Sequence, residues 1–142
     1  MGHPRLRADA PVDRRAGVFA LAQRAADWWL THSSHDHVAF WDFDDPASFN
    51  ATRDTSASAI VAAALLKLAV LANEDRRAAY RREAEAIVTA LVERFLDQRG
   101  LLSHGCDDKP GQVATKHELI WGSYYLLEAV EVLAGRLAAT AI

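Results

Sequence analysis

The sequence contains one cysteine, Cys106, which excludes a disulfide within the chain. A chain without disulfides is typical of a reducing compartment, so we expect a cytoplasmic location. Cys106 is followed by two aspartates in the motif SHGCDD. Because nearby negative charge raises the pKa of a thiol, we expect Cys106 to be a poor nucleophile.

Long apolar runs and excess positive charge are also missing. The longest apolar run, residues 57–66, is too short to cross a bilayer, and the polar residues 1–15 do not resemble a secretion signal. The net charge is −3, from 16 Lys and Arg against 19 Asp and Glu. We therefore expect neither a membrane nor a nucleic acid as a partner.

Alternating, strand-like patterns are absent, and apolar residues instead recur every three or four positions. This periodicity predicts an all-α fold, with one domain at residues 12–142 and a flexible tail at residues 1–11. The 142 residues are 51% hydrophobic, which is enough for a core. The expected helices cover about residues 12–31, 54–72, 77–97 and 116–137.

For two of these helices, the periodicity predicts which residues form the buried face. The apolar face of the third comprises Tyr80, Ala84, Ile87, Val88, Leu91 and Phe95. The stripe of the second comprises Ile60, Ala64, Leu68 and Leu71, together with Val61 and Leu65. Because Lys67 is the only charge in the second helix, we expect neighbouring elements to cover most of its circumference.

The connections differ in length. The short polar segment NEDRR joins the second and third helices, whereas residues 32–53 and 98–115 form long connections. Long loops in a compact helical domain are usually functional. We therefore look for a site in the two long connections and the helix ends beside them.

The first long connection begins with HSSHDH, which contains His32, His35, Asp36 and His37. These residue types are metal ligands, but a site needs ligands that converge, and the sequence shows no second cluster to complete one. A polar helix terminus is the favoured interpretation, and we expect no metal.

The same connection continues with FWDFDDP, residues 40–46. In one interpretation the aromatic residues pack the end of the helical domain, while Asp44 or Asp45 binds local backbone in an Asx turn. In the other, an aromatic ring stacks on the apolar side of a sugar and a carboxylate binds its hydroxyls. The spacing alone leaves both open.

Two further motifs also allow two interpretations. The segment RDTS, residues 53–56, is either a helix cap by Asp54 or Thr55 with a local ion pair, or an anion site at a positive helix end. The segment WGSYY, residues 121–125, either packs core aromatics beside a close helix contact at Gly122 or extends the sugar platform.

Taken in order, FWDFDDP, RDTSASAIVAAALLKLA, GLLSHG and ELIWGSYYLLEAV resemble the C-terminal portion of the unsaturated glucuronyl hydrolases, glycoside hydrolase family 88. The resemblance implies that the four helices form the C-terminal part of an (α/α)6 barrel, which remains incomplete. It also implies a substrate with a 4,5-unsaturated uronic acid at its non-reducing end, hydrolysed by hydration of the double bond without a cofactor.

The sequence departs from the family pattern in two respects. The family's proton-transferring aspartates belong to helices upstream of the matched motifs, so we expect no catalytic residue and no activity from this chain alone. Ser123 stands where relatives commonly have an acid. The alternative is a non-catalytic helical module that binds a partner or a sugar, and in either case the first and fourth helices present faces for self-association.

The resemblance assigns substrate-binding roles without catalysis. Two tryptophans would form the platform, an arginine and a serine would lie near the pocket mouth, and His104 with residues 112–116 would lie in the loop that faces the leaving sugar. The complete set is Trp41, Asp42, Arg53, Asp54, Ser56, His104, Lys116, Trp121 and Tyr124.

Overall fold

The computed structural model describes residues 14–45 and 51–141, and the tail expected at residues 1–11 lies outside them. The described residues form four helices and no strand, which confirms the all-α fold. The helices are α1 (Arg14–His32), α2 (Thr55–Leu71), α3 (Glu74–Phe95) and α4 (Ile120–Leu133).

The bounds of α3 and α4 differ from those expected. α3 begins at Glu74 because Asn73 caps it, its side chain accepting a hydrogen bond from the Arg76 backbone N–H. α4 is shorter than expected because residue 119 is extended at its start. At its other end Gly135 adopts a φ of 71°, which is typical of a residue that ends a helix.

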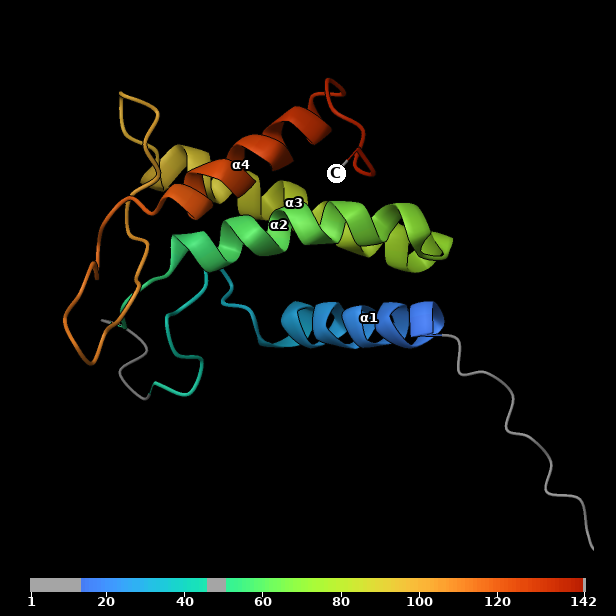
Figure 1. The fold of residues 1–142 in the computed structure, drawn as a ribbon, viewed down its shortest axis with the longest axis horizontal. Coiled ribbons are helices and arrows are strands. Elements are labelled where there is room, and N and C mark those ends of the chain that lie inside the picture. The colour runs from blue at the N-terminus through green and yellow to red at the C-terminus, as the bar shows by residue number, and fades with distance from the viewer. Residues whose placement is uncertain (1–13, 46–50, 142) are drawn as a thin grey trace, which may run out of the picture.

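The helices run alternately in opposite directions along the molecule (Figure 1). α2 lies at the centre and packs against α3 and α4, whereas α1 contacts it more sparsely. The N-terminal ends of α2 and α4 lie at one end of the molecule, beside both long connections (Figure 1). The residues singled out in the sequence therefore gather at this end.

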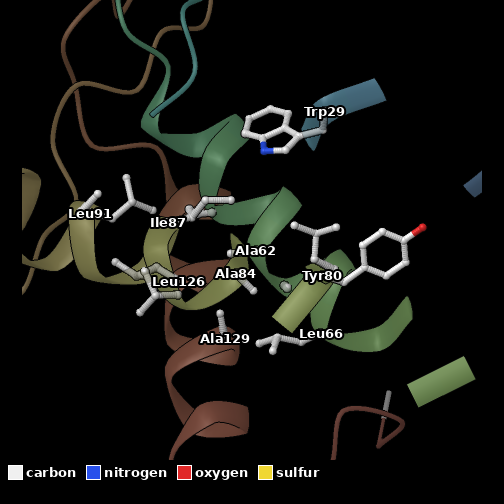
Figure 2. Packing of buried hydrophobic residues seen from close by; sticks show 14 of the residues in the cluster. Trp29, Ala62, Leu66, Tyr80, Ala84, Ile87, Leu91, Leu126 and Ala129 are labelled. Carbon is white, nitrogen blue, oxygen red and sulfur yellow. The ribbon is translucent and has the colours of Figure 1, made fainter. Parts of the chain in front are cut away.

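The core lies where α2, α3 and α4 meet, with side chains from all three helices pointing inward (Figure 2). The apolar face predicted for α3 is confirmed, because five of its six residues are buried and Phe95 is partly buried. Small side chains on α2 allow its neighbours to approach closely. The buried residues there include Ala59, Ala62, Ala63, Leu65, Leu66 and Ala69.

The apolar stripe predicted for α2 is wrong in its main row. Ile60 and Leu71 are 38% and 64% exposed, because α3 and α4 pack on the alanine-rich face instead. Nine of the 17 residues of α2 are nevertheless buried, which agrees with the expectation that neighbours cover most of this helix, and Val70 belongs to the smaller exposed part. An apolar groove between α1 and α2 remains open, lined by residues that include Trp28, Val61 and Leu68.

Polar contacts hold α1 against α3. The Tyr80 hydroxyl donates a 2.7 Å hydrogen bond to Asp27, and Arg76 lies 2.9 Å from the same carboxylate. Burial, together with the bond to Asp27, raises the pKa of Tyr80 to about 12. Two residues further along α1, the indole N–H of Trp29 donates to Glu83 at 3.2 Å.

Candidate functional site

The N-terminal end of α2 is built around the carboxylate of Asp54. Asp54 is the N-cap, and its Oδ1 accepts hydrogen bonds from the Ser56 backbone N–H at 3.0 Å and the Ser56 hydroxyl at 2.6 Å. A longer bond, 3.4 Å, comes from the Cys106 backbone N–H of the second long connection. The predicted cap is confirmed, and it ties α2 to a loop distant in the sequence.

Trp121, on the first turn of α4, completes this arrangement. Its Nε1–H donates to the Ser56 hydroxyl at 3.1 Å, so Asp54, Ser56 and Trp121 form a continuous chain that we call the cap cluster. Trp121 is nevertheless 41% exposed, and Tyr124 is 54% exposed. These exposures place neither ring in the described core, and a sugar platform formed by the two rings stays a prediction.

The close helix contact predicted at Gly122 is present. A Cβ added there would lie 2.9 Å from the Cβ and 3.1 Å from the Cα of Ser56, closer than packed side chains allow. The missing side chain of Gly122 therefore permits the N-terminal ends of α2 and α4 to touch. This contact brings the indole of Trp121 within reach of the Ser56 hydroxyl.

His104 lies beside the same helix end. Its backbone carbonyl accepts a 3.2 Å hydrogen bond from the Thr55 N–H, so its position is fixed by the first residue of α2. The ring Nδ1 lies 2.9 Å from the Ser103 hydroxyl, and the ring edge packs against Phe95. A φ of 64° shows that His104 adopts the left-handed conformation, in which the backbone turns sharply.

Lys116 is brought to this region by a backbone pairing. Gly105 and His117 exchange two hydrogen bonds, of 2.9 and 3.1 Å, which place residue 116 next to the strand-like segment that follows His104. The Lys116 side chain is exposed. A flexible cation at this position is available to an acidic ligand.

Arg53 is adjacent in sequence to the cap residue Asp54, but its guanidinium contacts residues of the first long connection instead. It forms two hydrogen bonds with Asp36, at 2.9 and 3.0 Å, and a third with the Val38 carbonyl. It also stacks over the Phe40 ring at 4.0 Å. The local ion pair predicted within residues 53–56 is therefore wrong in its partner, since Arg53 pairs with Asp36, and these contacts favour a structural role. A substrate contact by Arg53 stays a prediction.

Asp36 binds a second arginine as well, since Arg94 of α3 lies 3.1 Å from its Oδ2. Burial opposes ionisation of this carboxyl, but the hydrogen bond from Ser34 and the charge of Arg53, with smaller contributions, outweigh it and lower its pKa to about 2. By pairing with both Arg53 and Arg94, Asp36 joins the first long connection to α3. Sequence reasoning missed this role because the partners are far apart in the chain.

This lowered pKa predicts a loss of stability in acid. The unfolded carboxyl, with its ordinary pKa near 3.8, takes up a proton before the folded one does, so stabilisation by Asp36 is complete above about pH 4 and is lost as the pH falls toward about 2. We expect the difference in unfolding free energy between the native chain and Asp36→Asn, on the order of 1 kcal/mol after solvent screening, to shrink over this range. Urea titrations at several pH values measure it, and a constant difference would contradict the assignment.

The FWDFDDP segment contains the predicted Asx turn, with a different aspartate. Asp42 Oδ1 accepts a hydrogen bond from the Asp44 N–H at 2.9 Å, whereas Asp45 pairs with Lys109 at 2.6 Å. Trp41 is half-buried, and its backbone N–H donates to the Thr52 carbonyl at 2.8 Å. Trp41 and Asp42 thus belong to the loop end, while their contact with a sugar stays a prediction.

Two of the three histidines of HSSHDH, His32 and His37, have a structural partner. His32 stacks on Trp28 with ring centroids 4.3 Å apart, and His37 Nδ1 lies 3.0 Å from Glu83. Within residues 14–45 and 51–141, no group of three or more His, Cys, Asp and Glu side chains is arranged to hold a metal ion. The contacts of His32 and His37 agree with a polar helix terminus.

Cys106 is buried at the loop end. Burial, followed by the negative charge of Asp54, raises the pKa of its thiol. The direction agrees with the sequence prediction, although burial contributes more than the neighbouring acids. A thiol in this environment is a weak nucleophile.

Comparison with known proteins shows which enzymes this chain is similar to. No family model matches the chain, but it is 33% identical over 122 residues to the unsaturated glucuronyl hydrolase of Bacillus sp. strain GL1. The chain is a relative of the unsaturated glucuronyl hydrolases. The match covers 81% of this chain and 32% of the Bacillus protein, so the chain spans about a third of the length of this relative.

Two further comparisons give a similar result. The unsaturated chondroitin disaccharide hydrolase of Streptococcus pneumoniae is 26% identical over 122 residues, covering 79% of this chain and 30% of its own length. The crystal structure of the Bacillus sp. GL1 enzyme matches with a TM-score of 0.77 at 32% identity, covering 83% of this chain and 33% of that one.

A further neighbour was solved with a sugar bound. It is a variant of the unsaturated glucuronyl hydrolase of Streptococcus agalactiae in complex with dGlcA-GalNAc6S, with a TM-score of 0.66 at 26% identity, covering 74% of this chain and 30% of that one. These neighbours are (α/α)6 barrels, and the four helices described here correspond to about a third of one. No described helix is long and apolar enough to cross a membrane.

Proposed function

We propose that this chain forms part of the substrate-binding wall of an enzyme that hydrates 4,5-unsaturated uronic acids at the non-reducing end of oligosaccharides. The observation that carries the proposal is the half-exposed indole of Trp121, anchored at the end where both long loops meet. An aromatic face of this kind suits the apolar side of a sugar ring. The names of the relatives, which specify unsaturated glucuronyl substrates, support the same choice.

The surrounding groups suit the rest of such a substrate. Tyr124 is exposed one turn beyond Trp121, and His104 and the exposed Lys116 lie on the adjacent loop. A uronic acid carries a carboxylate, for which a lysine is an appropriate counter-ion. In this proposal the sugar ring stacks on Trp121, and the loop that bears His104 faces the remainder of the oligosaccharide.

Binding without turnover is the second part of the proposal. Hydration of a vinyl ether needs an acid to protonate carbon and a base to activate water. Asp54 already accepts three hydrogen bonds on one oxygen, and Asp42 is committed to the Asp44 backbone. These contacts give both carboxylates a structural role, and in this proposal the reaction depends on residues outside this chain.

We therefore expect the purified chain to bind an unsaturated uronyl disaccharide and leave it unconsumed. Saturable quenching of tryptophan fluorescence should be abolished in Trp121→Ala and retained in Trp28→Ala, which removes a similarly exposed indole from the α1–α2 groove. The absorbance of the conjugated double bond should stay constant.

Two results would overturn this proposal. Quenching that survives Trp121→Ala and disappears in Trp28→Ala would move the sugar to the groove. Turnover at roughly 1–1000 per second that is lost in Asp42→Asn or Asp54→Asn would show that the chain contains the catalytic residues after all.

A second candidate function, self-association, is favoured by the apolar faces of α1 and α4. Five large side chains there are more than half exposed, namely Val18, Leu21, Ile120, Tyr124 and Leu127. A stable interface buries about 800 Å² per partner, and such faces supply apolar area of the required kind. We expect sedimentation to show a mass that rises with protein concentration, and Leu127→Lys to reduce it. A monomer at every concentration would contradict self-association.

A further inference from the structure

The direction of the hydrogen bonds in the cap cluster is fixed by chemistry. A carboxylate at Asp54 can only accept, and an indole N–H at Trp121 can only donate. Ser56 joins them, because its single hydroxyl proton goes to Asp54 at 2.6 Å and a lone pair accepts the indole proton at 3.1 Å. Ser56 is only 3% exposed, so water does not compete freely for either bond.

The backbone beneath the indole is constrained as well. Gly122 sits against Ser56 so closely that a Cβ would be 2.9 Å from the serine Cβ. The start of α4 therefore packs directly on α2, and the Nε1–H of Trp121 is bonded to the same residue, Ser56. The indole is held at its backbone and at its polar edge, yet 41% of the residue remains exposed.

We propose that Ser56 and Asp54 are positioning residues that hold the indole of Trp121 in its sugar-stacking orientation before a ligand arrives. This inference rests on the proposed function. A free indole would lose rotamer freedom when a sugar binds, and fixing it in advance removes that cost. Asp54 orients the serine hydroxyl, and the hydroxyl orients the ring.

The first test detects the hydrogen bond from the Trp121 indole to the Ser56 hydroxyl, without any sugar present. In the NMR spectrum of this 15.6 kDa chain, the indole N–H resonance of Trp121 is assigned by its loss in Trp121→Phe. We expect Ser56→Ala to move that resonance toward the position of a solvent-exposed indole. Ser58→Ala is the matched control, because it removes another buried hydroxyl of α2 that bonds the Ala39 N–H and not Trp121. An unmoved resonance in Ser56→Ala would overturn the proposal.

The second test asks whether the bond matters for binding. We expect Ser56→Ala to weaken affinity for an unsaturated uronyl disaccharide by about three- to ten-fold, as the loss of one hydrogen bond implies. In a Trp121→Phe background, which has no indole N–H, the same substitution should change affinity by less than about two-fold. A general structural effect would persist in that background, so an undiminished loss there would overturn the positioning role.

The two proposals fail in different ways. A native chain that shows no saturable binding overturns the proposed function, and with it any role of Ser56 in recognising a sugar. A native chain that binds, combined with an affinity unchanged by Ser56→Ala, leaves the function standing and overturns the positioning of Trp121. Binding together with the expected coupling between residues 56 and 121 supports both.

Discussion

Leu91→Ala is expected to lower the free energy of unfolding by about 2–5 kcal/mol, the usual cost of truncating a large buried side chain. Leu91 is fully buried on α3, on the same face as Ile87 and Tyr80, and that face packs into the main core (Figure 2). The core of this chain is small and rich in alanine, so little material is available to fill the cavity. Urea denaturation followed by circular dichroism measures the loss.

Val92→Ala provides the matched control. Val92 is the next residue of α3 but points away from the core and is 41% exposed. We expect a change within about 0.5 kcal/mol, as for most surface substitutions. Equal losses at positions 91 and 92 would mean that α3 is rotated relative to the packing described here.

Gly122→Ala is expected to destabilise the chain by about 1–3 kcal/mol through overpacking. Helix propensity alone predicts the opposite, a gain of about 1 kcal/mol for alanine over glycine. We expect the steric effect to outweigh helix propensity, because the added Cβ would lie 3.1 Å from the Cα of Ser56. A backbone atom cannot rotate away as the end of a flexible side chain can. Thermal and urea unfolding give both the sign and the size.

Gly17→Ala separates these two contributions. Gly17 lies within α1, and an added Cβ there meets no atom within 4 Å. We expect this substitution to be neutral or to stabilise the chain by up to about 1 kcal/mol. A stabilising Gly122→Ala would show that α2 and α4 do not touch at their N-terminal ends.

The helices were predictable because their signals are local. The apolar face of α3 alternates clearly with charged residues, so the buried residues Tyr80, Ile87 and Leu91 could be chosen from periodicity. α2 is apolar almost all round, and periodicity cannot choose a buried face when every face is apolar. Packing against α3 and α4 selected the alanine-rich side, which only the tertiary structure reveals.

The contacts of the candidate site also fall into two groups, local ones that could be predicted from the sequence and distant ones that could not. The cap at Asp54 could be predicted from neighbouring residues, and a close approach at Gly122 could be predicted from glycine beside aromatics. The partners could not be predicted, because Trp121 reaches Ser56 across 65 residues and Arg94 reaches Asp36 across 58. No local pattern specifies such pairs.

The central claim is that an unsaturated uronyl sugar binds at the end of the molecule where the two long loops meet. Titration of an unsaturated uronyl disaccharide into isotopically labelled chain, followed by NMR, tests it most directly. We expect saturable shifts at Trp121, Tyr124 and His104, with little change in the α1–α2 groove. Shifts confined to that groove, or none at any sugar concentration, would contradict it.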